Sequence, residues 1–314
     1  MTTRICFLLP PRDQMAMPSP GSAMAKCLAQ GDSETSDSGA QAQFGRHVDV
    51  LPRQLSMAAV SRQVDHGDAV GSSWLRADPV LMQADMTTGR LMAHGPGLDL
   101  SPDDVENLLK PLKPLFGDEG FPISAGSGSE QARHRWYLQM PAETELPTFV
   151  APEDALGADL GDCLPEGPTG RRWRRLFSEA QIVLHNHDLN VRRRQSGLPP
   201  VNALWFWGGG RLPDSVSFSH AQVVSEDEHW KMLLAYSGQA PGRIEDFEAA
   251  TARSGIDGDW LLDLRGRRDA AKVVEAALPS IQRHLQDGRV SFDFADGLAV
   301  CWRRSHRWRF WRRG

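Results

Sequence analysis

The chain has few cysteines, few tyrosines and no long hydrophobic run. Its 314 residues include four cysteines, which are widely spaced and form no Cys-x-x-Cys pair, so neither a disulfide framework nor a zinc knuckle is predicted. The longest apolar runs are too short to cross a bilayer, and the apolar stretch near the N-terminus is too short for a secretory signal. We therefore expect a cytoplasmic protein with reduced thiols and no membrane partner.

Charged residues make up an ordinary 24% of the chain but are unevenly distributed. The net charge is −5, yet residues 141–166 hold seven acidic and no basic residues, whereas residues 301–314 hold six arginines and no acidic residue. The segment 302–313 alternates arginine with aromatic residues, a composition found on surfaces that bind single-stranded nucleic acid. We favour the interpretation that this segment forms a final β-strand with Trp308 and Phe310 on one face. Acidic neighbours such as residues 143–166 would then balance its arginines.

The hydrophobic patterns predict an α/β fold. Ser101 followed by Pro102 and two acidic residues predicts a helix start, and Asp296-Gly297 predicts the turn of a hairpin. Residues 12–43 are rich in Ser, Gly, Asp and Gln and show little periodicity, so the sequence does not tell how far this tract is ordered. The predicted helices are the one after Ser101, 171–187 and 269–286, and the predicted strands are 4–9, 135–140, 203–207 and the hairpin 290–304.

The most informative segment is 178–210. It predicts a helix that ends near His187, a polar turn at 188–190, a strand at 203–207 that is apolar on both faces, and a glycine loop at 208–210. Asn190 and Asn202 lie where the chain changes direction, so their side chains are expected to be at least partly buried and to join the helix to the strand. Arg193 is expected to be exposed.

This order of elements resembles the segment with which archaeal-type, cofactor-independent phosphoglycerate mutases leave their inserted substrate domain and return to an alkaline-phosphatase-like core. The strand end Trp-Phe-Trp-Gly-Gly-Gly at 205–210 is similar to RpfE-type regulatory proteins. The resemblance implies an α/β fold with two parts. A degenerate alkaline-phosphatase-like core with a mixed sheet would comprise residues 1–73 and 200–314, and an inserted α+β domain would comprise residues 74–199.

The residues that the mutase resemblance implies for catalysis are not found. Phosphoryl transfer in that superfamily uses two metal ions held by Asp and His, together with a serine nucleophile. The first predicted strand ends in Pro10-Pro11 where the family has an Asp, and none of the ten histidines has an Asp four residues before it. The arginine-rich motif that would hold a substrate phosphate is replaced by residues 92–97. We predict no catalytic residue, no metal site and no cofactor.

The sequence contains one short motif of the kind that binds metal ions. Asp65-His66-Gly67-Asp68 resembles the Asp-His-Gly metal motif of the superfamily, but it precedes the predicted insertion instead of following it. We interpret it as a structural turn.

The favoured function is that of a non-catalytic regulatory or ligand-sensing protein, whose partner is a small anionic ligand or a regulatory protein. A surviving pocket is predicted where the end of the helix meets the glycine end of the strand. His185 and His187 are two residues apart, so on a helix they point to different faces and are not predicted to form a metal pair. The predicted lining residues are Glu179, His185, His187, Asn190, Arg194, Asn202, Trp207, Gly208, Gly209 and Gly210.

Two alternatives remain open. The chain could be a metal-dependent phosphoglycerate mutase or related phosphotransferase, which needs metal ligands that the sequence does not show. It could also bind nucleic acid or an acidic partner through the Arg/Trp-rich segment 302–313, which predicts strongly salt-dependent association.

Overall fold

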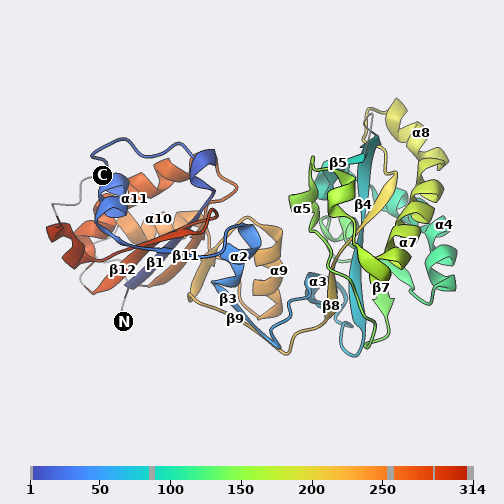
Figure 1. Ribbon diagram of the computed structural model, residues 1–314, viewed down its shortest axis with the longest axis horizontal. Helices are drawn as coiled ribbons and strands as arrows, with labels where there is room; N and C mark the ends of the chain where they lie inside the picture. The colour runs from blue at the N-terminus through green and yellow to red at the C-terminus, as the bar shows by residue number, and fades with distance from the viewer. Residues whose placement is uncertain (1–2, 85–88, 253–257, 286, 310–314) are drawn as a thin grey trace. The chain divides into compact units, whose positions relative to one another are not determined.

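A computed structural model of the chain describes residues 3–84, 89–252, 258–285 and 287–309 (Figure 1). The contacts divide the chain into two compact units, Met1–Val50 with Ser215–Gly314 (unit 1) and Leu51–Asp214 (unit 2). Each unit combines helices with a sheet, so the predicted α/β class with mixed strand directions is confirmed. No helix in the described ranges is long and apolar enough to cross a lipid bilayer.

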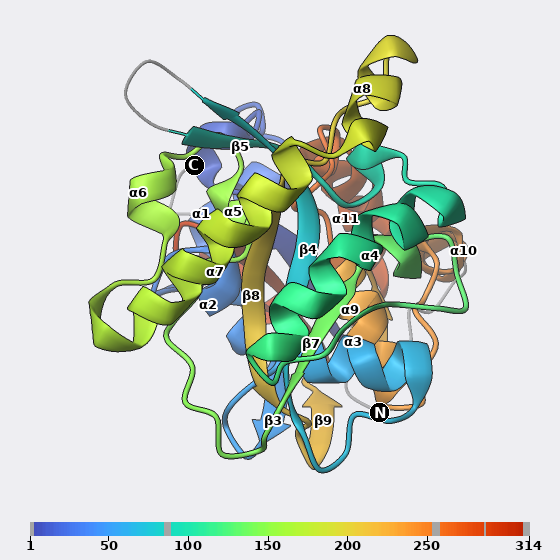
Figure 2. The same ribbon diagram turned by 90° about the vertical axis from the view of Figure 1, so that its right-hand side faces the viewer.

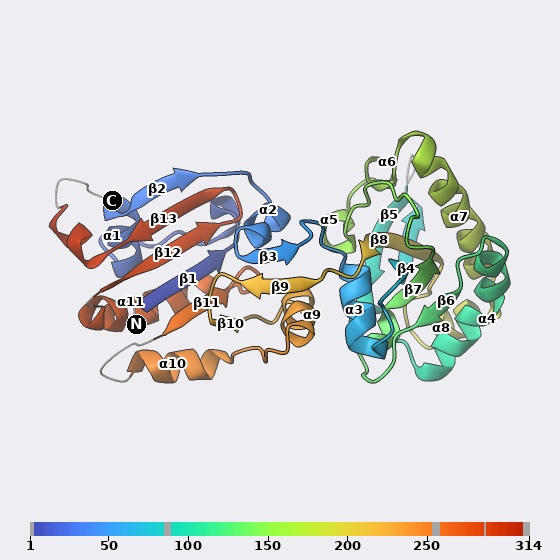
Figure 3. The ribbon, with the colours of Figure 1, turned by 90° about the horizontal axis from the view of Figure 1, so that it is seen from below.

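Unit 1 is built on a six-stranded sheet. Strands β10, β11, β1 and β12 run parallel, β13 runs antiparallel to β12, and β2 runs antiparallel to β13. The predicted hairpin is confirmed, with Gly297 in the left-handed region that its turn requires. Figure 3 shows the six strands side by side, in the order β10 (Gln222–Val224), β11 (Asp259–Asp263), β1 (Thr3–Leu9), β12 (Gly288–Phe294), β13 (Leu298–Trp302) and β2 (Asp32–Thr35).

Three helices cover one face of this sheet, namely α1 (Ala23–Gln30), α10 (Ile244–Ala252) and α11 (Ala270–His284). Alternate residues of β1, Ile5, Phe7 and Leu9, point into the core that these helices share. Arg4 and Cys6 therefore point to the other face. The sequence left the order of residues 12–43 open, and part of this tract is helical: Ser22 caps α1, and both Met24 and Cys27 are buried in this core.

A second group of elements packs beside the carboxyl ends of β1 and β12. Gln43 of α2 (Ala40–Gly45) donates to the carbonyl oxygens of Leu9 and Asp293, and Phe44 packs edge-on against Trp230 of α9 (Glu228–Tyr236). The two-stranded ribbon of β3 (Val48–Leu51) and β9 (Ser215–Phe218) adjoins them.

Unit 2 is organised around the long strand β4 (Ser73–Ala84). One side of β4 pairs with β8 (Ala203–Arg211), and the other strands are β5 (Gly89–His94), β7 (Trp136–Met140) and β6 (Ile123–Ala125). Helices α4 (Pro102–Asp118) and α7 (Gly167–His185) lie across one face of this sheet (Figure 2), where Trp173 stacks on Phe121 with ring centroids 5.6 Å apart. Helix α3 (Met57–His66) packs on Trp74 and Tyr137.

The shorter elements complete the chain. Helix α8 follows α7 closely, where the sequence predicted only a polar turn. The others lie in connections, including the one between β7 and α7. Their bounds are η1 (Arg12–Gln14), η2 (Gly95–Leu98), η3 (Ala132–His134), α5 (Pro152–Ala155), α6 (Leu160–Cys163), α8 (Asp188–Gln195) and η4 (Arg304–Trp308).

The boundaries of unit 2 differ from those that the sequence predicted for the inserted domain. Prediction placed them at 73/74 and 199/200, whereas the contacts place them at 50/51 and 214/215. The reason is that β8 pairs along β4 from Ala203 to Arg211, and α3 packs against both strands.

Asn190 joins α7, α8 and the start of β8. Its side chain is fully buried, its amide nitrogen donates to the carbonyl oxygens of Leu184 and Val201 at 2.7 Å each, and its amide oxygen accepts from the Val201 N–H at 2.8 Å. Asn202 is half-buried and bonds both backbone groups of Met82 in β4. Asn190 therefore forms the predicted joint between helix and strand, whereas Asn202 ties the start of β8 to β4 instead of to the helix.

The expectation of an exposed Arg193 is wrong. Its side chain is 2% exposed and forms an ion pair with Asp104 at 2.6 Å. It also donates to the backbone carbonyl oxygens of Leu98 and Pro199. Arg193 therefore ties α8 to the start of α4. The sequence could not show this, because Arg193 lies between two other arginines and nothing nearby distinguishes it from them.

Asn190→Ala should lower the free energy of unfolding by about 1–3 kcal/mol, because it leaves buried backbone groups without hydrogen-bond partners. Asn186→Ala is the matched control, since Asn186 is exposed and its side chain donates to the Ile182 carbonyl oxygen in the last turn of α7; its effect should stay below about 0.5 kcal/mol. Urea denaturation of the two variants measures the difference. Equal effects would contradict the assigned joint.

Candidate functional site

The structure does not bring the sequence-predicted pocket residues together. Asn190 and Asn202 lie at the start of β8, whereas Gly208–Gly210 lie near its end. At about 3.3 Å per strand residue, the two groups are roughly 20 Å apart. The three glycines belong to the strand instead of a loop. Gly208 has φ +66°, and a Cβ atom there would lie 3.3 Å from that of Met57, so the glycines let α3 approach the strand.

The remaining predicted lining residues have local roles. Glu179 pairs with Arg175 one turn earlier on α7, and the Nδ1 atom of His187 accepts from the Leu189 N–H at the start of α8. His185 and Arg194 are exposed. Trp207 is buried, and its indole N–H donates to Asp78 at 2.7 Å.

The Asp65-His66-Gly67-Asp68 segment has the structural role that we expected. Gly67 ends α3 in the left-handed conformation. Asp65 forms a buried ion pair with Arg135 at 2.6 Å and accepts from the Tyr137 hydroxyl, and Asp68 pairs with Arg62.

Polar side chains instead converge at the carboxyl edge of the unit 1 sheet, the usual ligand edge of parallel α/β sheets. Asp293, near the end of β12, is 3% exposed. Arg46 donates to it at 2.6 and 3.1 Å, and His47 Nε2 lies 2.7 Å from its Oδ2 atom. Burial raises the pKa of Asp293, but the hydrogen bonds from His47 and Arg46 outweigh burial and hold the pKa below its usual value.

The other carboxylates at this edge also have arginine partners. Asp263, the last residue of β11, accepts two bonds from Arg265 at 2.8 and 2.7 Å. It also accepts from the Ser225 hydroxyl at 2.9 Å. Asp296 in the β12–β13 turn pairs with Arg12 at 2.6 Å.

This donor set does not fit the pair of metal ions that the mutase resemblance implies. A divalent metal needs free carboxylate or imidazole donors directed at one point, whereas here each carboxylate faces a guanidinium. In the described ranges, no group of three or more His, Cys, Asp or Glu side chains is arranged to hold a metal ion.

A hydrogen-bonded chain continues from Asp293 across the same unit. His47 Nδ1 lies 3.1 Å from the Ser219 hydroxyl, which lies 2.7 Å from His220 Nδ1. The order Asp293, His47, Ser219 has the connectivity of an activated serine. However, Arg46 already neutralises Asp293, and the Ser219 N–H bonds the His47 carbonyl oxygen at 2.9 Å. The chain therefore closes the β3–β9 ribbon onto the sheet.

Burial disfavours ionisation of the nearby thiol. Cys6 Sγ lies 4.0 Å from His47 Nε2, and burial, followed by the charge of Asp293, strongly raises the pKa of this thiol. The sequence offered no signal for any of these residues, because His47 and Asp293 are 246 positions apart.

Comparison with known proteins gives sequence relatives of one kind. The chain is 29% identical over 174 residues to the 2,3-bisphosphoglycerate-independent phosphoglycerate mutase of Methanosarcina barkeri, covering 52% of this chain and 42% of that protein. For the Methanosarcina mazei enzyme the identity is 28% over 209 residues, covering 63% and 50%. A probable mutase of Geobacter sulfurreducens is 38% identical over 71 residues, covering 23% and 18%.

The chain thus spans half or less of the length of these relatives, and no protein-family model matches it. Its homologues include archaeal-type cofactor-independent mutases, as the resemblance implied. Among solved structures, a cofactor-independent phosphoglycerate mutase from Thermoplasma acidophilum has a TM-score of 0.41 at 15% identity, covering 96% of this chain and 90% of that chain. A Pyrococcus horikoshii protein has a TM-score of 0.48 at 12% identity, covering 96% and 87%.

His220 should make folding sensitive to acid. Burial lowers its pKa from 6.5 to about 4 despite Asp259 nearby, so between these pH values the unfolded chain binds a proton that the folded chain does not. The free energy of unfolding should therefore fall as pH drops from about 6.5 to 4, by up to roughly 3 kcal/mol.

Denaturant titrations of His220→Gln and the parent chain at pH 7.5, 5.5 and 4.5 test this. The variant should lose stability less steeply with falling pH than the parent. His229→Gln is the control, because His229 is a less buried histidine of the same unit. Parallel pH profiles for His220→Gln and the parent would rule out the assignment.

Proposed function

We propose that this protein is a non-catalytic, ligand-sensing regulatory protein derived from a cofactor-independent phosphoglycerate mutase. The sequence similarity to the mutases supports the derivation. The observation that carries the loss of catalysis is the pairing of Asp293, Asp263 and Asp296 with arginines at the carboxyl edge of the unit 1 sheet.

The charges of these arginines disfavour metal binding at the carboxylates. Asp293 and Asp263 each accept a bidentate guanidinium, which neutralises the carboxylate charge and occupies one lone pair on each oxygen. A metal ion would have to displace that cation, and the freed arginine would then repel the metal. The similarity of the Trp-Phe-Trp-Gly-Gly-Gly strand end to RpfE-type proteins adds support for a regulatory role.

The ligand and the compartment belong to the same proposal. A small anion derived from, or similar to, a phosphorylated metabolite is the natural ligand for a protein of this ancestry, with a regulatory protein as the partner that reads its occupancy. All four cysteines are free, and Cys6 and Cys27 are buried, which suits a reducing cytoplasm.

The Arg/Trp-rich segment supports the nucleic-acid alternative only in part. The strand predicted for 302–313 is wrong in its described part, because β13 ends at Trp302 and Arg304–Trp308 form η4. Buried His306 fixes this turn. Asp32 supplies counter-charge to Arg309 at 2.5 Å and to Arg303 at 3.5 Å. Phe310, Trp311, Arg312 and Arg313 lie outside the described residues.

The purified full chain should not interconvert 2- and 3-phosphoglycerate with Mn²⁺, Mg²⁺, Co²⁺ or Zn²⁺ present, because the carboxylates at the sheet edge are held by arginines. A coupled enolase assay measures this, with the Methanosarcina mazei mutase as the positive control. Metal-dependent turnover that disappears in Asp293→Asn would overturn the proposal and establish the mutase alternative.

A further inference from the structure

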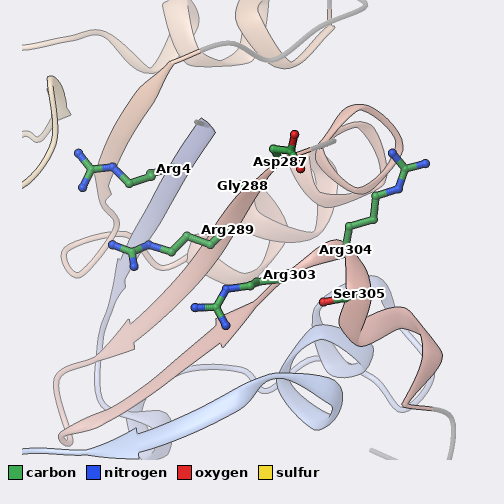
Figure 4. A pocket seen from close by; sticks show the side chains of 7 residues that line it. All are labelled: Arg4, Asp287, Gly288, Arg289, Arg303, Arg304 and Ser305. Atoms are coloured by element: carbon green, nitrogen blue, oxygen red, sulfur yellow. The ribbon is translucent and has the colours of Figure 1, made fainter. Parts of the chain in front are cut away.

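A recess of about 590 Å³ opens in unit 1 beside the amino ends of β1 and β12, at the opposite edge from Asp293. Arg4, Arg289 and Arg303 extend in the same direction from neighbouring positions along one side of it, and we call these three residues the arginine row (Figure 4). Arg304 and Asp287 are directed away from the row. The recess is lined by Arg4, Asp287, Gly288, Arg289, Arg303, Arg304 and Ser305.

The strand register places the row in line. Arg4 of β1 lies directly opposite Arg289 of β12. Val290 lies opposite Trp302, so the next antiparallel position sets Arg303 opposite Arg289. With neighbouring strands about 4.8 Å apart, the three α-carbons span roughly 10 Å.

Such a row is electrostatically unfavourable by itself, because like charges directly opposite each other on paired strands repel. The outer members have counter-charges, since Arg4 pairs with Asp259 and Arg303 lies 3.5 Å from Asp32. The side chain of Arg289, between them, is exposed and makes no hydrogen bond or ion pair with any residue that the structure describes. The middle of the row therefore holds a cation without a counter-ion.

The backbone fixes the closeness of the strands at this point. A Cβ atom on Gly288 would lie 2.2 Å from the Thr3 carbonyl oxygen, so only glycine permits the approach of β12 to β1. Arg4 and Arg289 follow these two residues directly. They are thus presented from rigid strands, which favours a site with defined geometry over a diffuse basic surface.

We propose that the arginine row binds a small ligand that carries two adjacent phosphate groups. A guanidinium binds phosphate oxygens through two parallel N–H donors, and each phosphate of a diphosphate can bridge two neighbouring arginines. Two linked phosphates place several negative charges within the span of the row, whereas a single carboxylate carries only one. This inference deepens the proposed function, because it gives the sensed anion a place and a chemical class.

Pyrophosphate is the probe that tests the site. Isothermal titration of the full chain at low salt should show saturable binding of pyrophosphate, and inorganic phosphate should bind about tenfold more weakly or worse. Arg289→Gln should weaken pyrophosphate binding by about tenfold or more, since it removes charge-assisted hydrogen bonds. Arg268→Gln, an equal charge change at an exposed position after β11, should change the affinity by less than about twofold.

Thermal unfolding without ligand gives a second readout. Arg289→Gln should have a midpoint equal to or above that of the parent chain, because it relieves repulsion within the row, and its midpoint should no longer rise when pyrophosphate is added. A merely structural arginine would instead lower the ligand-free midpoint.

Four results would overturn the inference: no pyrophosphate binding by the parent chain, equal binding by Arg289→Gln, equal affinity for phosphate and pyrophosphate, or binding of a single-stranded oligonucleotide in place of pyrophosphate. Mutase turnover would contradict the proposed non-catalytic function, but it would not affect the conclusion about pyrophosphate binding. The two failures are therefore distinguishable.

Discussion

The buried Asp293 carboxylate is the interaction on which the functional part of unit 1 depends. It stands near the end of a central parallel strand, and Arg46 and His47 reach it from the segment between α2 and β3. A buried carboxylate without partners is costly, so removal of either partner would loosen this segment. Asp293 thus holds the β3–β9 ribbon in place through Arg46 and His47.

Unit 2 depends on a comparable pair. Arg76 and Asp78, two residues apart on β4, are both buried and exchange two hydrogen bonds at 2.8 and 2.7 Å. Asp78 also accepts from the Trp207 indole, and the Arg76 guanidinium lies 4.9 Å from the centre of that ring. With the backbone N–H of Trp136 as a further donor, the polar atoms of the pair are satisfied, which is the condition for keeping charges inside a sheet. Both units therefore devote buried acidic residues to architecture.

Features that rest on neighbouring residues were predictable from the sequence. The helix after Ser101 forms with a capping box between Ser101 and Asp104, and the Asp296-Gly297 hairpin forms where its turn residues stand. Asn190 was identified as a joint because it sits at a change of direction. By contrast, α1 was missed because its stability comes from burial of Met24 and Cys27 against α11, and not from its own weak pattern.

The candidate site could not be predicted from the sequence, because it too depends on long-range packing. The glycines at 208–210 follow an apolar run, as a phosphate loop would, but their close contact with α3 keeps them within β8. The arginine row is assembled by strand register from positions 4, 289 and 303, which no local motif connects. Both the packing of the glycines and the alignment of the arginine row depend on contacts between segments far apart in the chain. Such contacts cannot be predicted from local patterns in a single sequence.

The central claim of the proposed function is that arginines hold the carboxylates at the carboxyl edge of the unit 1 sheet, so that these carboxylates do not bind metal ions. Anomalous diffraction at the manganese edge, from crystals of the full chain grown with Mn²⁺ at neutral pH, tests it most directly. The account predicts no manganese peak at coordination distance from Asp293 or Asp263, with Arg46 and Arg265 in contact with these carboxylates. A manganese ion ligated by Asp293, with Arg46 displaced, would contradict it.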